Sequence, residues 1–166
     1  MTFRIPKGWH YGLPLFTWLW WNKKVFTWKV QFTDSCRYDL QSDDQLDTNK
    51  LCGIGYFPGF HHVDSARFGW QYDRELERIM LSAYCYVNKE RVILPITTIP
   101  LKKAYLIQLT INNGSYFFKV IDESGNKLGG TGIAFSHKNK LQYLLLPYFG
   151  GNRKAPHSMK IQLKRI

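Results

Sequence analysis

The chain of 166 residues fits a single domain, residues 1–166, and its 45% of apolar residues excludes a disordered polypeptide. Aromatic residues reach 16%, which favours half-buried β-sheet surfaces. The 23 Lys and Arg against 12 Asp and Glu give a formal net charge of +11, so we expect anionic partners rather than cationic ones.

The first 33 residues predict three strands. Phe3–Ile5 is predicted as a short edge strand, and the apolar run Leu13–Trp21 as a buried strand. That run is too short to span a bilayer and lacks the small-residue cleavage site of a secretion signal, so we expect a cytoplasmic protein with no membrane partner. Val25–Thr33 is the clearest strand, because apolar and polar side chains alternate strictly along it.

The middle of the chain predicts a polar loop and then three strands. Asp34–Asn49 shows no periodicity, and Lys50–Phe57 resumes as a strand that contains two glycines. Ser65–Tyr86 predicts a hairpin with a charged turn, and each of its strands alternates with a period of two. One face of the hairpin is apolar and belongs to the core, for which we predict buried positions at Trp28, Phe68, Trp70 and Leu81.

The last third of the chain predicts further strands separated by turns. They are expected at Arg91–Leu94, Tyr105–Ile111, Tyr116–Ile121, Leu141–Tyr148 and Ser158–Ile166, with irregular connections at Pro95–Pro100 and Glu123–Gly132. No stretch has a helical period of any length. The pattern predicts an all-β, single-domain antiparallel β-sandwich of the jelly-roll type, with a barrel as the alternative.

The second face of the hairpin is the main candidate binding surface. Alternation places an arginine, a glutamine, a serine and two tyrosines on it: Arg67, Gln71, Ser82, Tyr84 and Tyr86. Arginine presents a planar fork that matches a carboxylate or a phosphate, and tyrosines add stacking area with a hydroxyl group. We expect Gln108, Thr110 and Lys119 on the next hairpin to extend this surface. The alternative is an arginine that only stacks on its tyrosine neighbours.

Two further segments carry candidate ligand-binding residues. His61 and His62 precede the hairpin, and a vicinal pair on an extended chain points its rings to opposite sides, which makes a poor metal chelate. The loop Pro147–His157 contains two glycines beside Asn152 and Arg153, and its amides can form an anion-binding nest or simply turn the chain into the last strand.

The sequence predicts no metal site, no cofactor and no catalytic constellation. The acidic loop Asp34–Asn49 does not have EF-hand spacing, and we expect it to be solvated or to pair with a basic surface of a second subunit, with a calcium site as the alternative. A homo-oligomer therefore stays open as a partner. The three cysteines cannot all pair with one another, and we expect free thiols at Cys36, Cys52 and Cys85.

Several segments spread over residues 35–159 resemble a family of small uncharacterised bacterial and phage-borne proteins. These segments are SCRYDL, DQLDTNKLCGIGYF, HHVDSARFGWQYD, AYCYVN and PYFGGNRKAPHSM. The layout also resembles concanavalin A-like jelly rolls, including polysaccharide lyases, in which an NKL-x-G-like strand precedes an arginine-bearing strand and a Tyr-x-Tyr strand. That resemblance implies a jelly-roll fold. The alginate-lyase signatures are incomplete, because ARFGW lacks a glutamate and LIQLTI lacks a histidine.

Charge distribution and layout together favour binding over catalysis. No acidic residue precedes Asp34 and none follows Glu123, so both ends of the chain are wholly basic. We expect the protein to bind a small anionic ligand, a nucleotide or an acidic saccharide, without transforming it. If the phage resemblance holds, it sequesters a nucleotide-derived defence signal of the host. The alternatives are a lyase or hydrolase acting on an acidic glycan, and a glycan-binding or structural module of a virion.

Overall fold

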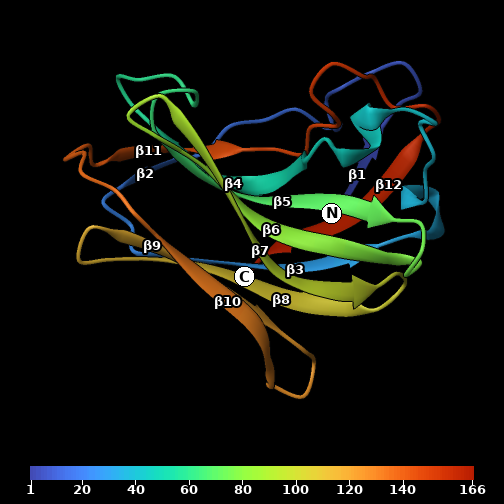
Figure 1. The fold of residues 1–166 in the computed structure, drawn as a ribbon. Helices are drawn as coiled ribbons and strands as arrows, with labels where there is room; N and C mark the ends of the chain where they lie inside the picture. Colours follow the sequence, from blue (N-terminus) through green and yellow to red (C-terminus); the bar gives the residue numbers. More distant parts are fainter.

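A computed structural model describes all 166 residues as two six-stranded antiparallel sheets packed face to face (Figure 1). The first sheet has the order β1 (Thr2–Ile5), β12 (Met159–Arg165), β3 (Val25–Phe32), β8 (Ala104–Asn112), β9 (Ser115–Ile121) and β10 (Lys127–Ala134). The second has the order β2 (Leu19–Trp21), β11 (Leu141–Leu145), β4 (Asn49–Tyr56), β5 (Ser65–Asp73), β6 (Arg78–Val87) and β7 (Glu90–Pro100). The predicted jelly-roll-like sandwich is confirmed.

Strands distant in the sequence pair at the centre of both sheets. β3 lies between β12 and β8, and β4 lies between β11 and β5, which are the crossovers expected of a jelly roll. Helical structure is confined to two short 3-10 turns in the acidic loop, η1 (Asp34–Cys36) and η2 (Asp43–Leu46). None of the helical segments is long and apolar enough to cross a bilayer.

The core is built from aromatic rings that meet across the two sheets. Trp28 of β3 packs edge-on against Phe68 of β5 with ring centroids 6.4 Å apart, and Phe32 lies 5.2 Å from Trp70. These four side chains and Leu81 are buried, as the alternation of both strands predicted. The three cysteines are also buried, with free thiols.

The expected buried strand Leu13–Trp21 is wrong. Only Leu19–Trp21 forms a strand, β2 at the edge of the second sheet, and Leu13 makes an isolated bridge with Arg4. Most of the run is exposed, with Trp21 at 72%. The run is apolar for another reason: it lies across the side of the sandwich, where the Arg165 guanidinium stacks on Trp18 at 4.5 Å. Apolar composition alone could not separate a buried strand from such a covering segment.

Two of the expected irregular connections are in fact strands. β7 continues through Pro95 to Pro100. It is the edge strand of its sheet, where a proline, which has no backbone N–H, can be accommodated without the loss of a hydrogen bond to a neighbouring strand. β10 occupies most of the expected glycine-rich loop. Its glycines serve close packing, since a Cβ on Gly129 would lie 2.5 Å from the Ile96 carbonyl oxygen and one on Gly130 2.8 Å from that of Phe118.

The inter-sheet aromatic contacts should dominate stability. We expect Trp70→Ala to lower the free energy of unfolding by about 3–5 kcal/mol, as truncation of large core aromatics does. Trp21→Ala, which removes the same side chain from an exposed position, should change it by less than about 0.5 kcal/mol. Denaturant unfolding of the two variants measures both values, and equal losses would contradict the assignment of the core.

Candidate functional site

The outer face of the second sheet carries the candidate site. On β5 and β6, alternation turns Arg67, Ser82 and Tyr84 away from the core, on the side opposite Phe68 and Trp70. All three are nevertheless buried, and Arg67 is only 7% exposed. Other segments of the chain therefore cover this face, and the candidate site lies between them and the sheet.

Arg67 is a buried cation without a carboxylate partner. Its Nη2 donates to the carbonyl oxygen of Leu146 at 3.2 Å, and its Nε is buried with no hydrogen-bond partner. The ionisable groups acting on it are phenols and a thiol, those of Tyr84, Cys52, Tyr143 and Tyr148. Burial lowers the pKa of Arg67 to about 10, so it stays charged at neutral pH while part of its hydrogen-bonding capacity is unused.

Lys50 of β4 adds a second cation beside Arg67. Its Nζ donates to the carbonyl oxygen of Gly150 at 2.8 Å and lies 4.9 Å from the ring centroid of Tyr84 and 5.6 Å from that of Tyr148. Burial, and then the charge of Arg67, lowers the pKa of Lys50 to about 8. A substantial fraction of this lysine is therefore neutral just above physiological pH.

A cavity of about 210 Å³ opens next to Arg67. Its polar lining comes from Tyr11, His61, Arg67 and Tyr148, and apolar side chains supply the rest: Phe16, Leu144, Leu145, Leu146 and Pro147. The ring of Tyr148 stacks on His10 and meets Tyr11 edge-on, so one part of the wall is aromatic. Burial, followed by the charge of Arg67, lowers the pKa of His61 to about 4, which leaves its imidazole neutral at pH 7.

The tyrosines around the cations are neutral phenols. Burial raises the pKa of Tyr84 to about 12 and also raises the pKa values of Tyr143 and Tyr148. Tyr143 lies directly over Gly55 of β4, where any Cβ would overlap its ring. Each phenol can donate or accept a hydrogen bond and offers a ring face for stacking.

The structure brings some of the predicted residues together and leaves others apart. Arg67, His61 and Tyr84 belong to the site, and His62 and Tyr86 adjoin it with ring centroids 5.1 Å apart. The two histidine rings lie 4.2 Å apart because they sit in a turn, so the expectation that they point to opposite sides is wrong.

Two predicted members of the hairpin face have other surroundings. Gln71 donates through Nε2 to the carbonyl oxygen of Leu46, and Ser82 keeps its buried hydroxyl without a partner. Both lie on the expected face but line no part of the cavity beside Arg67.

Three predicted site residues lie elsewhere. Lys119, with Gln108 and Thr110, is on β8 and β9 of the first sheet, so the expectation that this hairpin extends the surface is wrong. Arg153 forms an ion pair with Asp44 at 2.8 Å, and the neighbouring Asn152 is exposed. The loop therefore anchors the acidic segment of its own chain.

The acidic loop pairs within the chain rather than standing free. Besides Asp44, Asp39 pairs with Arg74, and Asp34 pairs with both Arg37 and Lys102. Three carboxylates of the loop, those of Asp34, Asp39 and Asp44, are thus paired with bases of the same chain. No group of three or more His, Cys, Asp or Glu side chains is arranged to hold a metal ion.

Sequence reasoning missed Lys50, Tyr143, Tyr148 and Tyr11. Gly53 faces outward, and strict alternation from it would turn Lys50 inward, toward the core. A bulge in β4 between Lys50 and Cys52 shifts the alternation by one residue, so Lys50 faces outward instead. Tyr143 lies in β11, Tyr148 follows that strand and Tyr11 comes from the segment after β1, and their meeting point depends on tertiary structure alone.

No protein-family model and no curated protein matches the chain, but solved structures do match it. An alginate lyase from Klebsiella pneumoniae superposes with a TM-score of 0.60 at 8% identity, over 86% of this chain and 59% of that one. A functionally unknown protein from Saccharomyces cerevisiae gives 0.58 at 11%, over 99% and 87%. Alginate lyase AlyC3 gives 0.54 at 14%, over 99% and 70%. These are similarities of fold, the jelly-roll sandwich.

The unpaired burial of Arg67 predicts an unusual stability effect. We expect Arg67→Met to leave the free energy of unfolding unchanged or to raise it, because replacing a buried, uncompensated ion by an apolar side chain removes a desolvation penalty. Arg37→Met is the control: Arg37 donates to the Tyr72 hydroxyl at 2.7 Å and pairs with Glu77, so its loss should be destabilising. Denaturant midpoints compare the two, and a clear loss for Arg67→Met would make Arg67 a structural residue.

Proposed function

We propose that this protein binds an anionic, ring-bearing ligand on the outer face of the second sheet, with the acid group of the ligand at Arg67, and does not transform it. The observation that carries the proposal is a buried arginine with an unused Nε, no carboxylate partner and a lysine beside it. A buried charge is normally paired, so the missing partner points to an external anion.

Electrostatics within the site support the proposal. The charge of Arg67 contributes to the lowered pKa values of both Lys50 and His61, and Arg91 acts on Lys50 in the same direction. The positive charges of these groups repel one another. An anion would relieve that repulsion and restore the charged form of Lys50.

Two classes of ligand share the required chemistry. A uronate oligosaccharide offers carboxylates and sugar rings, and a nucleotide offers phosphates and a base that can stack on Tyr84, Tyr143 or Tyr148. The fold similarity to alginate lyases supports the saccharide. For the nucleotide, the role would be a phage protein that sequesters a nucleotide-derived defence signal in the host cytoplasm.

Calorimetric titration tests the proposal with three probes: an alginate tetrasaccharide, a cyclic dinucleotide and the neutral cellotetraose. We expect one of the two acidic probes to bind and the neutral one not to. Arg67→Lys should weaken binding about tenfold, because it keeps the charge but loses the bidentate fork. Arg67→Ala should weaken it further. Equal affinity of wild type and Arg67→Ala for the acidic probe would refute the assignment.

Lys50 should make binding depend on pH. With a pKa of about 8, Lys50 is protonated below pH 7 and neutral above pH 9, so affinity for the anion should be constant up to pH 7 and fall through pH 8. His61, with a pKa of about 4, contributes nothing in this range. Lys50→Met should bind more weakly at pH 7 and lose the dependence. A flat profile for the wild type between pH 7 and 9 would contradict this role.

A second candidate function is a lyase acting on an acidic glycan, and the position of Lys50 favours it. In a β-elimination, neutral Lys50 would take the proton next to the uronate carboxylate while Arg67 neutralises the developing charge. The C–O bond to the neighbouring sugar then breaks and a C=C bond forms. The leaving oxygen takes up the proton that the Lys50 ammonium releases, which returns Lys50 to its neutral form. Ultraviolet absorbance of the new double bond, followed in the same titrations, separates this reaction from simple binding.

A further inference from the structure

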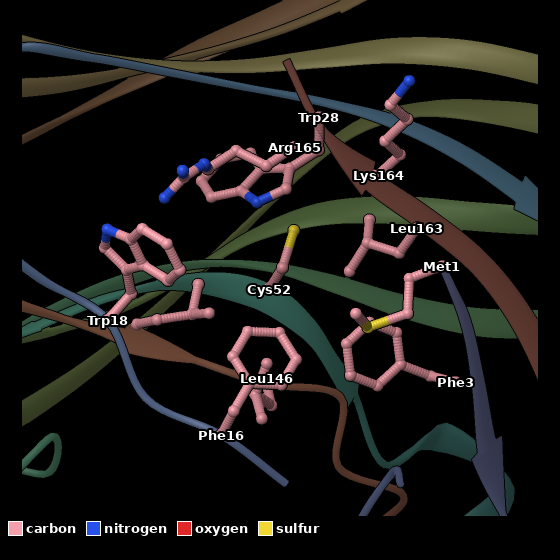
Figure 2. Close-up of a pocket in the computed structure, with 11 residues that line it drawn as sticks. Met1, Phe3, Phe16, Trp18, Trp28, Cys52, Leu146, Leu163, Lys164 and Arg165 are labelled. Atoms are coloured by element: carbon pink, nitrogen blue, oxygen red, sulfur yellow. The ribbon is translucent and has the colours of Figure 1, made fainter. Parts of the chain in front are cut away.

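A second cavity, of about 250 Å³, lies between the two sheets at the edge where β11 and β12 face each other. Phe3, Trp28 and Leu163 line it from the first sheet, and Cys52 and Leu144 from the second. Figure 2 shows the Cys52 thiol in the middle of this apolar group, with Phe16, Trp18 and Leu146 along one side.

Arg165 is placed at this cavity by the register of β12. It pairs with Trp28 of β3, and alternation along β12 puts it on the same inward side as Ile161 and Leu163. Its guanidinium stacks on Trp18 at 4.5 Å and lies 5.3 Å from the ring centroid of Trp20.

No acidic side chain forms an ion pair with Arg165. None of the ion pairs in the structure includes it, and no acid lines the cavity. The neighbouring Lys164 is also unpaired, but its ammonium points away from the cavity (Figure 2). The cavity is thus apolar inside, and the aromatic-stacked guanidinium of Arg165 lies at its mouth.

We propose that this cavity binds a small amphipathic acid, an aromatic or short aliphatic carboxylate, with its apolar body between the sheets and its carboxylate on Arg165. Ligand sites are typically apolar clefts in which a few polar groups fix orientation, and this cavity has that composition. The guanidinium fork suits a carboxylate, and the two indoles hold its plane in place.

The volume sets the size of the ligand. An apolar cavity of about 150 Å³ lined by aliphatic and aromatic side chains holds benzene. The 250 Å³ available here therefore fits one ring with a short chain.

This site is separate from the one at Arg67. The wall between the two cavities consists of Phe16, Leu144 and Leu146, which line both. Arg67 lies only on the outer side of this wall, and Arg165 only on the inner side. The inference holds whether or not the outer face binds an anion.

Calorimetry with 4-phenylbutyrate and its uncharged analogue 4-phenylbutan-1-ol tests the proposal. We expect the acid to bind more tightly than the alcohol. Arg165→Gln should lower the affinity for the acid about tenfold, because a charge-assisted contact is lost, and should change the affinity for the alcohol by less than about twofold. Lys164→Gln is the matched control and should change neither probe by more than about twofold.

Two further variants locate the bound probe. Cys52→Leu adds side-chain volume in the middle of the cavity and should weaken the binding of both probes. Arg67→Ala should weaken the binding of neither probe. The proposal is overturned if the acid binds no better than the alcohol, if Arg165→Gln and Lys164→Gln act alike, or if Arg67→Ala abolishes binding of the acid. The last result would move the probe to the outer face.

Discussion

The contact of β3 with β5 across the sandwich sets which side chains of β5 and β6 face the core and which face outward. Phe68 and Trp70 must face Trp28 and Phe32 to fill the space between the sheets, and a strand has only two faces. Once these rings point inward, Arg67 must point outward, above the sheet. The same phase carries into β6, where Leu81 faces the core and Tyr84 faces the site. The candidate binding face is therefore a consequence of core packing, and a slip of one residue would place the arginine among the aromatic rings of the core.

Glycines decide what fits above that face. Gly53 pairs with Arg67, and a Cβ there would overlap the backbone of β5; a Cβ on Gly55 would overlap the ring of Tyr143. Without these two glycines Tyr143 could not lie flat over β4, and β4 and β5 could not approach so closely. β4 is thus without side chains at the two positions next to Arg67 and Tyr143, and the site is completed by Tyr84 of β6, Tyr143 of β11 and residues outside the strands. For this reason the site contains tyrosines from several parts of the chain.

Strict alternation made the hairpin of β5 and β6, its core residues and the outward position of Arg67 predictable from sequence. Three features were not predictable, each for a physical reason. The bulge in β4 hid Lys50, because a one-residue shift leaves no trace in composition. The run before β2 is as apolar as a buried strand, yet it covers the side of the sandwich. Lys119 alternates as a site residue would, but it belongs to the other sheet, and sequence period cannot assign a hairpin to a sheet.

Each of the two cavities contains an arginine without an acidic partner, and the two arginines differ in how far they are removed from water. Arg165 keeps its charge near water and spreads it over two indoles, so its unpaired state costs little. Arg67 is withdrawn from water, and its burial lowers its own pKa while its charge helps to lower that of Lys50. A leucine or methionine at this position would satisfy the packing of the site equally well and avoid the desolvation penalty. The fold therefore tolerates a destabilising cation, and the large aromatic core between β3 and β5 supplies the stability that makes this tolerable.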